Sequence, residues 1–69
     1  MKIIVINDFM KFEILDVPAV PRVGDKIDVF FEPLPEVTSV VWFPSMERIT
    51  PFFAPGQVPE KIDAILSVR

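Results

Sequence analysis

The fold is decided first by the stretch Lys2–Val17, which reads KIIVINDFMKFEILDV. The continuous apolar run over residues 2–6 predicts a strand that is covered on both faces. Asn7-Asp8 predicts a tight turn, because both residues tolerate positive φ better than most. A second strand is expected over residues 11–17, and its imperfect alternation suggests a bulge or twist near Leu15.

The composition favours the same class of structure. The chain has 69 residues, of which 51% are apolar, and ten Val, eight Ile and seven Phe stand against three Leu and three Ala. Branched and aromatic side chains suit a pleated, half-buried surface better than a helix. We therefore expect residues 1–69 to form one small all-β domain. A chain this short encloses little core, so part of its apolar surplus should lie on a surface used for self-association or for a partner.

Eight prolines divide the chain into short segments, a spacing that suits a small barrel. Gly24-Asp25 supplies a turn before a third strand, expected over residues 26–32, and a fourth is expected over 37–43. Residues 62–68 fit both helical and strand periodicity. A strand is favoured there, because a fifth strand would protect the sheet edges that four strands leave open. The sequence predicts a five-stranded barrel or partial barrel with one long proline- and aromatic-rich loop over residues 44–61.

Two segments carry a resemblance to known proteins. Pro18–Ile27 reads PAVPRVGDKI, and Val37–Trp42 reads VTSVVW. Together they resemble short uncharacterised bacterial and phage proteins with an SH3-like small β-barrel, in which a Pro-x-x-Gly-Asp turn leads into a strand and a Val-x-x-Val-x-Trp strand follows. The resemblance covers about half of the chain. It implies an SH3-like fold and carries no activity, cofactor or binding residue.

The residue types that are missing exclude most enzyme chemistry. The chain has no cysteine, histidine or tyrosine, so it lacks disulfides, thiol chemistry, Cys/His zinc sites and the usual general base near neutral pH. Carboxylate pairs such as Asp25 with Asp28 or Glu32 with Glu36 fall in charged turns or on polar faces. Asp25 is expected to accept a bond from a nearby backbone amide and fix its turn. We expect no catalytic residue, no metal and no cofactor.

Charge and hydropathy bear on partners and location. Seven Lys and Arg against ten Asp and Glu give a net charge of -3, whereas nucleic-acid binders usually carry a basic footprint. No uncharged stretch reaches the roughly 18 residues of a membrane span. We expect a soluble cytoplasmic protein that binds neither nucleic acid nor membrane, since the lack of cysteine fits a reducing compartment.

Paired aromatics point to an interaction surface. Trp42 with Phe43, and Phe52 with Phe53, are chain neighbours, so in an extended chain the members of each pair face opposite sides. One of each can fill the core, and the other is left for a surface of the kind that interfaces favour. The partner would be a second copy or another protein. In the opposite interpretation the long loop folds back over an open barrel end and buries these rings. The expected interface comprises Phe30, Trp42, Met46, Ile49, Phe52 and Phe53.

A different class of function would use the cations in or beside the loops. They could converge on an anion while an aromatic ring, Trp42 or Phe52, stacks on a base. The protein would then sequester a small anionic, nucleotide-like metabolite, as phage proteins that act against host signalling do. In the simpler interpretation, these cations are dispersed over the surface and only make the protein soluble. The residues expected to bind in this alternative are Arg22, Lys26, Arg48 and Lys61.

Overall fold

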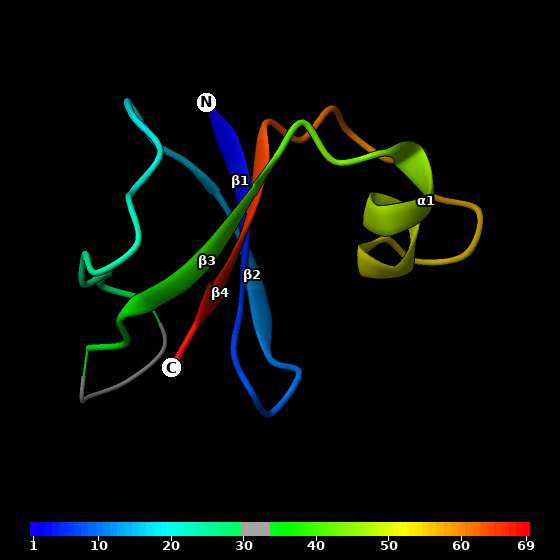
Figure 1. Ribbon diagram of the computed structural model, residues 1–69. Coiled ribbons are helices and arrows are strands. Elements are labelled where there is room, and N and C mark those ends of the chain that lie inside the picture. Colours follow the sequence, from blue (N-terminus) through cyan, green and yellow to red (C-terminus); the bar gives the residue numbers. More distant parts are fainter. Residues whose placement is uncertain (30–33) are drawn as a thin grey trace.

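Four strands form a single sheet in the protein, whose computed structural model describes residues 1–29 and 34–69. A short helix and one 3₁₀ turn follow the third strand (Figure 1). The all-β class is confirmed, and within the expected long loop a short helix begins directly after Ser45. The elements are β1 (Lys2–Ile6), β2 (Phe12–Asp16), β3 (Val37–Trp42), α1 (Met46–Ile49), η1 (Thr50–Phe52) and β4 (Ala64–Val68).

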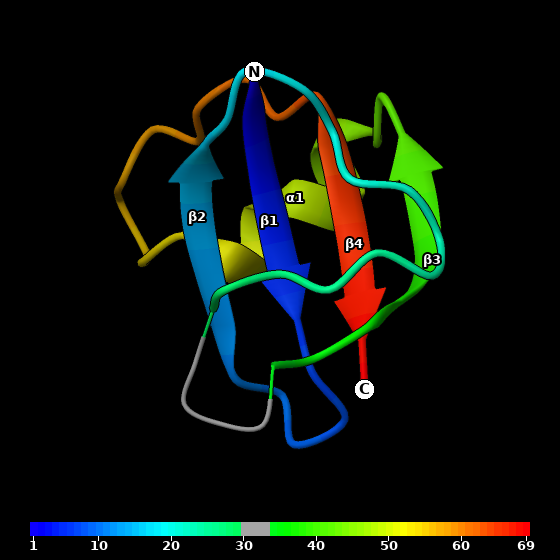
Figure 2. The same ribbon diagram turned by 90° about the vertical axis from the view of Figure 1, so that its left-hand side faces the viewer.

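The strand order in the sheet is β2-β1-β4-β3. β1 pairs antiparallel with β2 and parallel with β4, and β3 pairs antiparallel with β4. The strand expected near the C-terminus is therefore present, but it lies in the middle of the sheet instead of closing a barrel (Figure 2). β2 and β3 form the two edges, and within the described residues the sheet is open.

The prediction of a strand over residues 26–32 is wrong for residues 26–29. Residues 26–29 run as irregular chain, with one isolated bridge between Lys26 and Glu36. The remainder of that segment, including Phe30 and Glu32, lies outside the described residues. The bulge expected near Leu15 is also absent, because β1 and β2 keep one unbroken register, whereas β3 carries an irregularity between Val37 and Ser39.

Chain segments cover both faces of the sheet. The segment that follows β2 lies over one face, here called the loop face, and α1 with η1 lies over the other, here called the helix face (Figures 1 and 2). On the loop face Val20 and Ile27 pack against a core of strand residues, and on the helix face Ile49 packs against the buried Ile4. Two-sided cover explains why β1 reads as a continuous apolar run: Ile3, Ile4 and Val5 are all fully buried.

The two predicted turns are present, each with its own conformation. Asn7 accepts backbone N–H bonds on its side-chain oxygen from Phe9 and Lys11, both at 2.9 Å, and the positive φ falls on Met10, at 63°. Gly24 has the predicted positive φ, at 95°. The backbone N–H of Arg22 donates to the Asp25 carboxylate at 2.8 Å, so the structural role expected for Asp25 is confirmed.

Candidate functional site

Half of the residues expected at an interface contribute to the protein's own core. Ile49 is 3% exposed, and Phe52 and Phe53 are half-buried against the same helix-face cluster. The Phe52 ring meets Phe12 of β2 edge to face, with ring centroids 5.0 Å apart. Phe30 lies outside the described residues. The segment that carries Phe52 and Phe53 therefore folds back on the sheet, and these two rings cover its helix face.

The other two, Trp42 and Met46, are exposed and lie at the corner where β3 ends and α1 begins, Trp42 as the last residue of β3 and Met46 as the first of α1. Phe43 joins them there, and the three side chains are 51%, 58% and 71% exposed for Trp42, Met46 and Phe43. The rings of Trp42 and Phe43 lie 6.0 Å apart between centroids, tilted by 44°. We call this set, Trp42, Phe43 and Met46, the aromatic corner. Neither ring of the Trp42 and Phe43 pair enters the core, because Trp42 ends an edge strand and the chain turns directly after it.

The backbone of Phe43 is the cause of that turn. Its φ is 47°, in the left-handed region that bulky side chains disfavour, and its N–H donates to the Asp63 carbonyl at 2.8 Å. A strained, non-glycine conformation persists only where its surroundings hold it, and such residues cluster at functional sites. Sequence reasoning missed Phe43 as a surface residue, since positive φ is not expected of phenylalanine.

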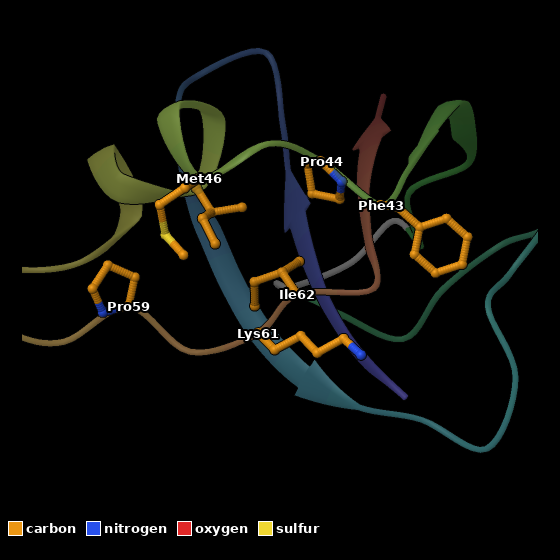
Figure 3. A pocket seen from close by; sticks show the side chains of 7 residues that line it. Phe43, Pro44, Met46, Pro59, Lys61 and Ile62 are labelled. Carbon is orange, nitrogen blue, oxygen red and sulfur yellow. The ribbon is translucent and has the colours of Figure 1, made fainter.

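A groove of about 390 Å³ runs beside the corner on the helix face (Figure 3). Its lining is apolar except for the Lys61 side chain, which comes from the segment that enters β4. A second hollow of about 310 Å³ lies next to it, between β3, β4 and α1, and includes Glu47 and Arg48. The first groove is lined by Phe43, Pro44, Met46, Ile49, Pro59, Lys61 and Ile62.

The four cations expected to hold an anion do not converge. Arg22 and Lys26 belong to the segment over the loop face, and Arg48 and Lys61 line the two hollows of the helix face. The sheet therefore separates the two pairs, and Arg48 and Lys61 themselves line different hollows. No single site in the described part of the chain brings all four charges to one ligand.

Among the described residues two ion pairs form: an exposed one between Arg69 and Asp8, 3.5 Å apart, and one at the N-terminal end of β1. Lys2 Nζ is 3.0 Å from Glu60 Oε2, and the Lys2 backbone N–H donates to the Asp63 carboxylate at 2.9 Å. The hydrogen bond that Lys2 donates to the Glu60 carboxylate, helped by the negative charges of Glu60 and Asp16, raises the pKa of Lys2 above its ordinary value of 10.5. Both side chains of the ion pair touch solvent, so the pair ties the β4 entry to β1 and does not form a reactive site.

A second exposed apolar feature is the tip of the β1–β2 hairpin. Phe9 and Met10 are 85% and 74% exposed there. The tip follows the C-terminal end of β1, whereas Trp42 pairs with Ala64 and so lies beside the N-terminal end of β1. The two exposed apolar features therefore stand at opposite ends of the sheet.

Comparison with known proteins gives no relative for this chain: no protein-family model, curated protein or solved structure matches it. Among residues 1–29 and 34–69, no group of three or more acidic side chains is placed to hold a metal ion. No helix in the same residues is both long and apolar enough to cross a membrane. The candidate site rests on the geometry of the aromatic corner alone.

Proposed function

We propose that the protein is a non-enzymatic binding protein that associates, with a second copy or with a protein partner, through its aromatic corner. The observation that carries the proposal is the exposure of Trp42, Phe43 and Met46 at one corner, whereas Phe52 and Phe53 of the segment that follows pack against the sheet. Exposed apolar side chains gathered in one place mark interaction sites, and aromatics and methionine are enriched at interface cores.

The size of the expected contribution follows from the exposed area. Phe and Trp side chains bury about 150–250 Å² each when fully covered, so the 71% of Phe43 that is exposed amounts to roughly 100–180 Å². At about 25 cal/mol per Å², covering it contributes about 3 kcal/mol. That is the range of a hot-spot residue, which costs about 2 kcal/mol or more on truncation.

The test replaces Phe43 with asparagine, which tolerates positive φ and removes the apolar ring. Phe9→Asn is the matched control, because Phe9 is the more exposed ring and lies at the opposite end of the sheet. Light scattering over a concentration series measures self-association. A photo-crosslinking phenylalanine analogue at position 43 or 9, used in the producing cell, measures contact with other proteins.

The proposal expects association or crosslinking that depends on position 43 and not on position 9. Equal behaviour of the two variants, or no crosslink from position 43 together with a monomer at every concentration, would contradict it.

The absence of enzymatic activity is part of the same proposal. Catalytic acids and bases are usually held in desolvated pockets, and the carboxylates of the expected pairs that are described, Asp25, Asp28 and Glu36, are all exposed. The Asp25 carboxylate is already engaged in its turn, where it accepts the backbone N–H of Arg22. We also retain as predictions a cytoplasmic location and the likeness to SH3-like small barrels of bacteria and phages.

Sequestration of a small anionic metabolite is the second candidate, in a narrower form than the sequence suggested. The apolar groove with Lys61 on its lining fits a ligand with an apolar or planar body and one anionic group. Calorimetry against a nucleotide panel tests this, with Lys61→Gln as the variant and Lys26→Gln as the control on the opposite face. A ligand whose affinity falls with Lys61→Gln alone would favour this candidate over association.

A further inference from the structure

Beyond Val37, the outer side of β3 pairs with no other strand among residues 1–29 and 34–69. The Phe43 N–H donates inward to Asp63, and antiparallel strands alternate the direction of their backbone groups, so the N–H and C=O groups of Val40 and Trp42 point outward. Val37, also outward, is already bonded to Gly24 and Asp25. In Figure 2 no described segment runs along the outer side of β3 beyond that contact, and no described residue bonds to the two outward pairs.

The two edges of the sheet differ in charge. β2 reads FEILD and carries Glu13 and Asp16, whereas β3 reads VTSVVW and carries no charge and no proline. Natural edge strands are usually guarded against pairing by charged residues or proline. Like charges placed opposite each other oppose strand pairing, and a neutral strand brings none when it meets a copy of itself. The unguarded edge is therefore self-complementary.

Resting on the proposed association, we propose that β3 pairs antiparallel with β3 of a second copy, around a two-fold axis at Val41, to give one eight-stranded sheet. In this register Val40 lies opposite Trp42 of the partner, so every outward N–H and C=O of the two residues finds a partner. Four backbone hydrogen bonds form across the axis. Val40 and Trp42 share the loop face, so each pair sets an aromatic ring against a branched side chain, a favourable cross-strand combination.

Both ends of the paired window are fixed by this chain. Toward the N-terminus, Gly24 and Asp25 already occupy the outward bonds of Val37. Toward the C-terminus, the left-handed backbone of Phe43 turns the chain and Pro44 has no N–H to donate. The outward N–H and C=O groups left between them are those of Val40 and Trp42, so the unpaired window is short and is centred on Val41.

The aromatic corner supplies the apolar area that a short strand pair lacks. Stable protein interfaces bury about 800 Å² per partner, and the three paired residues of each copy, 40–42, alone fall short of this. Trp42 in the window, with Phe43 and Met46 beyond its C-terminal end, would be covered by the second copy. Each copy carries a net charge of -3, so the dimer should tighten as salt screens the repulsion between copies.

The test uses the absence of cysteine from the chain. In the proposed register the two Val41 residues face each other as a non-hydrogen-bonded pair with Cα atoms about 4.5 Å apart, a separation that a disulfide spans. Ser39→Cys is the matched control on the same sheet face, because the two copies of Ser39 would lie about 13 Å apart along the strands. With oxidised glutathione, Val41→Cys should form a disulfide dimer at least about tenfold faster than Ser39→Cys.

Hydrogen exchange of the unmodified protein gives a second measurement that does not depend on a variant. The amides of Val40 and Trp42 should exchange at least about tenfold more slowly at high protein concentration, while the inward amide of Val41 changes less. Equal disulfide rates for the two cysteine variants, or exchange at Val40 and Trp42 that is independent of concentration, would overturn the strand pairing.

The failure of the strand pairing can be told apart from failure of the proposed function. A dimer that depends on Phe43 but gives no Val41 disulfide would leave association through the aromatic corner intact and remove the shared sheet. A protein that stays monomeric at every concentration would remove the second copy as the partner. Crosslinks from position 43 to other proteins would then still support the binding function.

Discussion

The turn at Gly24 gives the most direct test of the fold, through the substitution Gly24→Val. Gly24 has φ of 95° and its N–H donates to the Val37 carbonyl at 2.8 Å, so the turn fastens the loop-face segment to β3. Among the described residues, nothing lies within 4 Å of the place where a Cβ would stand, apart from the chain neighbours. The cost of a side chain is therefore conformational, not a steric clash with packed atoms.

The magnitude follows from two opposing effects. A left-handed backbone costs an L-residue about 1–2 kcal/mol, and a branched Cβ stiffens the residue further. Replacing glycine also restricts the unfolded chain, which returns about 0.4–1 kcal/mol of stability where the native angles suit the new residue. Because valine fits φ of 95° poorly, we expect Gly24→Val to lower the free energy of unfolding by more than about 1 kcal/mol.

Urea denaturation followed by Trp42 fluorescence measures this change. A domain of this size has an m-value near the lower end of about 1–3 kcal/mol/M, so the midpoint should fall by about 1 M with the slope unchanged. Gly24→Asn is the control, since asparagine tolerates positive φ and should cost less than half as much. An unchanged midpoint for Gly24→Val would show that this turn does not need its left-handed residue.

Three further outcomes are expected. Met10→Gly should raise the free energy of unfolding by about 0.5 kcal/mol, because it relieves the positive φ of an exposed side chain, and thermal denaturation would show it. Leu66→Ala should lower the free energy of unfolding by about 2–5 kcal/mol in the same assay, since it opens a cavity at a fully buried site of β4. The raised pKa of Lys2 means that its ion pair with Glu60 stabilises the fold fully below pH 10.5 and is lost as pH rises through the raised pKa. Urea midpoints measured up to pH 11.5 should therefore fall in the wild type more than in Lys2→Met.

Local pattern was enough to predict most of the strands. The continuous apolar run over residues 2–6 forms β1 and is buried on both faces, as expected. The alternation over residues 62–68 forms β4, with Ala64, Leu66 and Val68 buried. Gly24-Asp25 forms a turn because its glycine adopts the conformation that other residues resist. In each case residues close in sequence determine the result.

The order of the strands was not predictable in the same way. Alternating apolar residues describe a half-buried strand equally well in the middle of a sheet or at its edge, and only pairing between distant segments decides which. β4 enters the sheet beside β1 as a parallel neighbour, a contact across some sixty residues that no local signal marks. The closure expected of this strand is not seen within the described residues, because the strand lies in the middle of the sheet and not at an edge.

The aromatic residues divide for a related reason. Neighbouring rings in an extended chain must face opposite sides, and this alone cannot tell which ring meets a covering segment. Phe52 is held because η1 lies on the helix face, where the ring meets Phe12. Trp42 and Phe43 stay exposed because no described strand pairs with the outer side of β3 and the chain turns away from the sheet at Phe43.

The same arrangement links the sheet order to the proposed function. β1 and β4 are apolar on both faces, so burial places them in the centre, and the edges fall to β2 and β3. β2 carries charges at its edge, and β3 carries none. An open sheet with one charged and one neutral edge can pair through only one of them without bringing like charges together. The neutral edge ends in the exposed Trp42 and Phe43, so the backbone groups that seek a partner and the apolar area that would stabilise it lie on the same side of the protein.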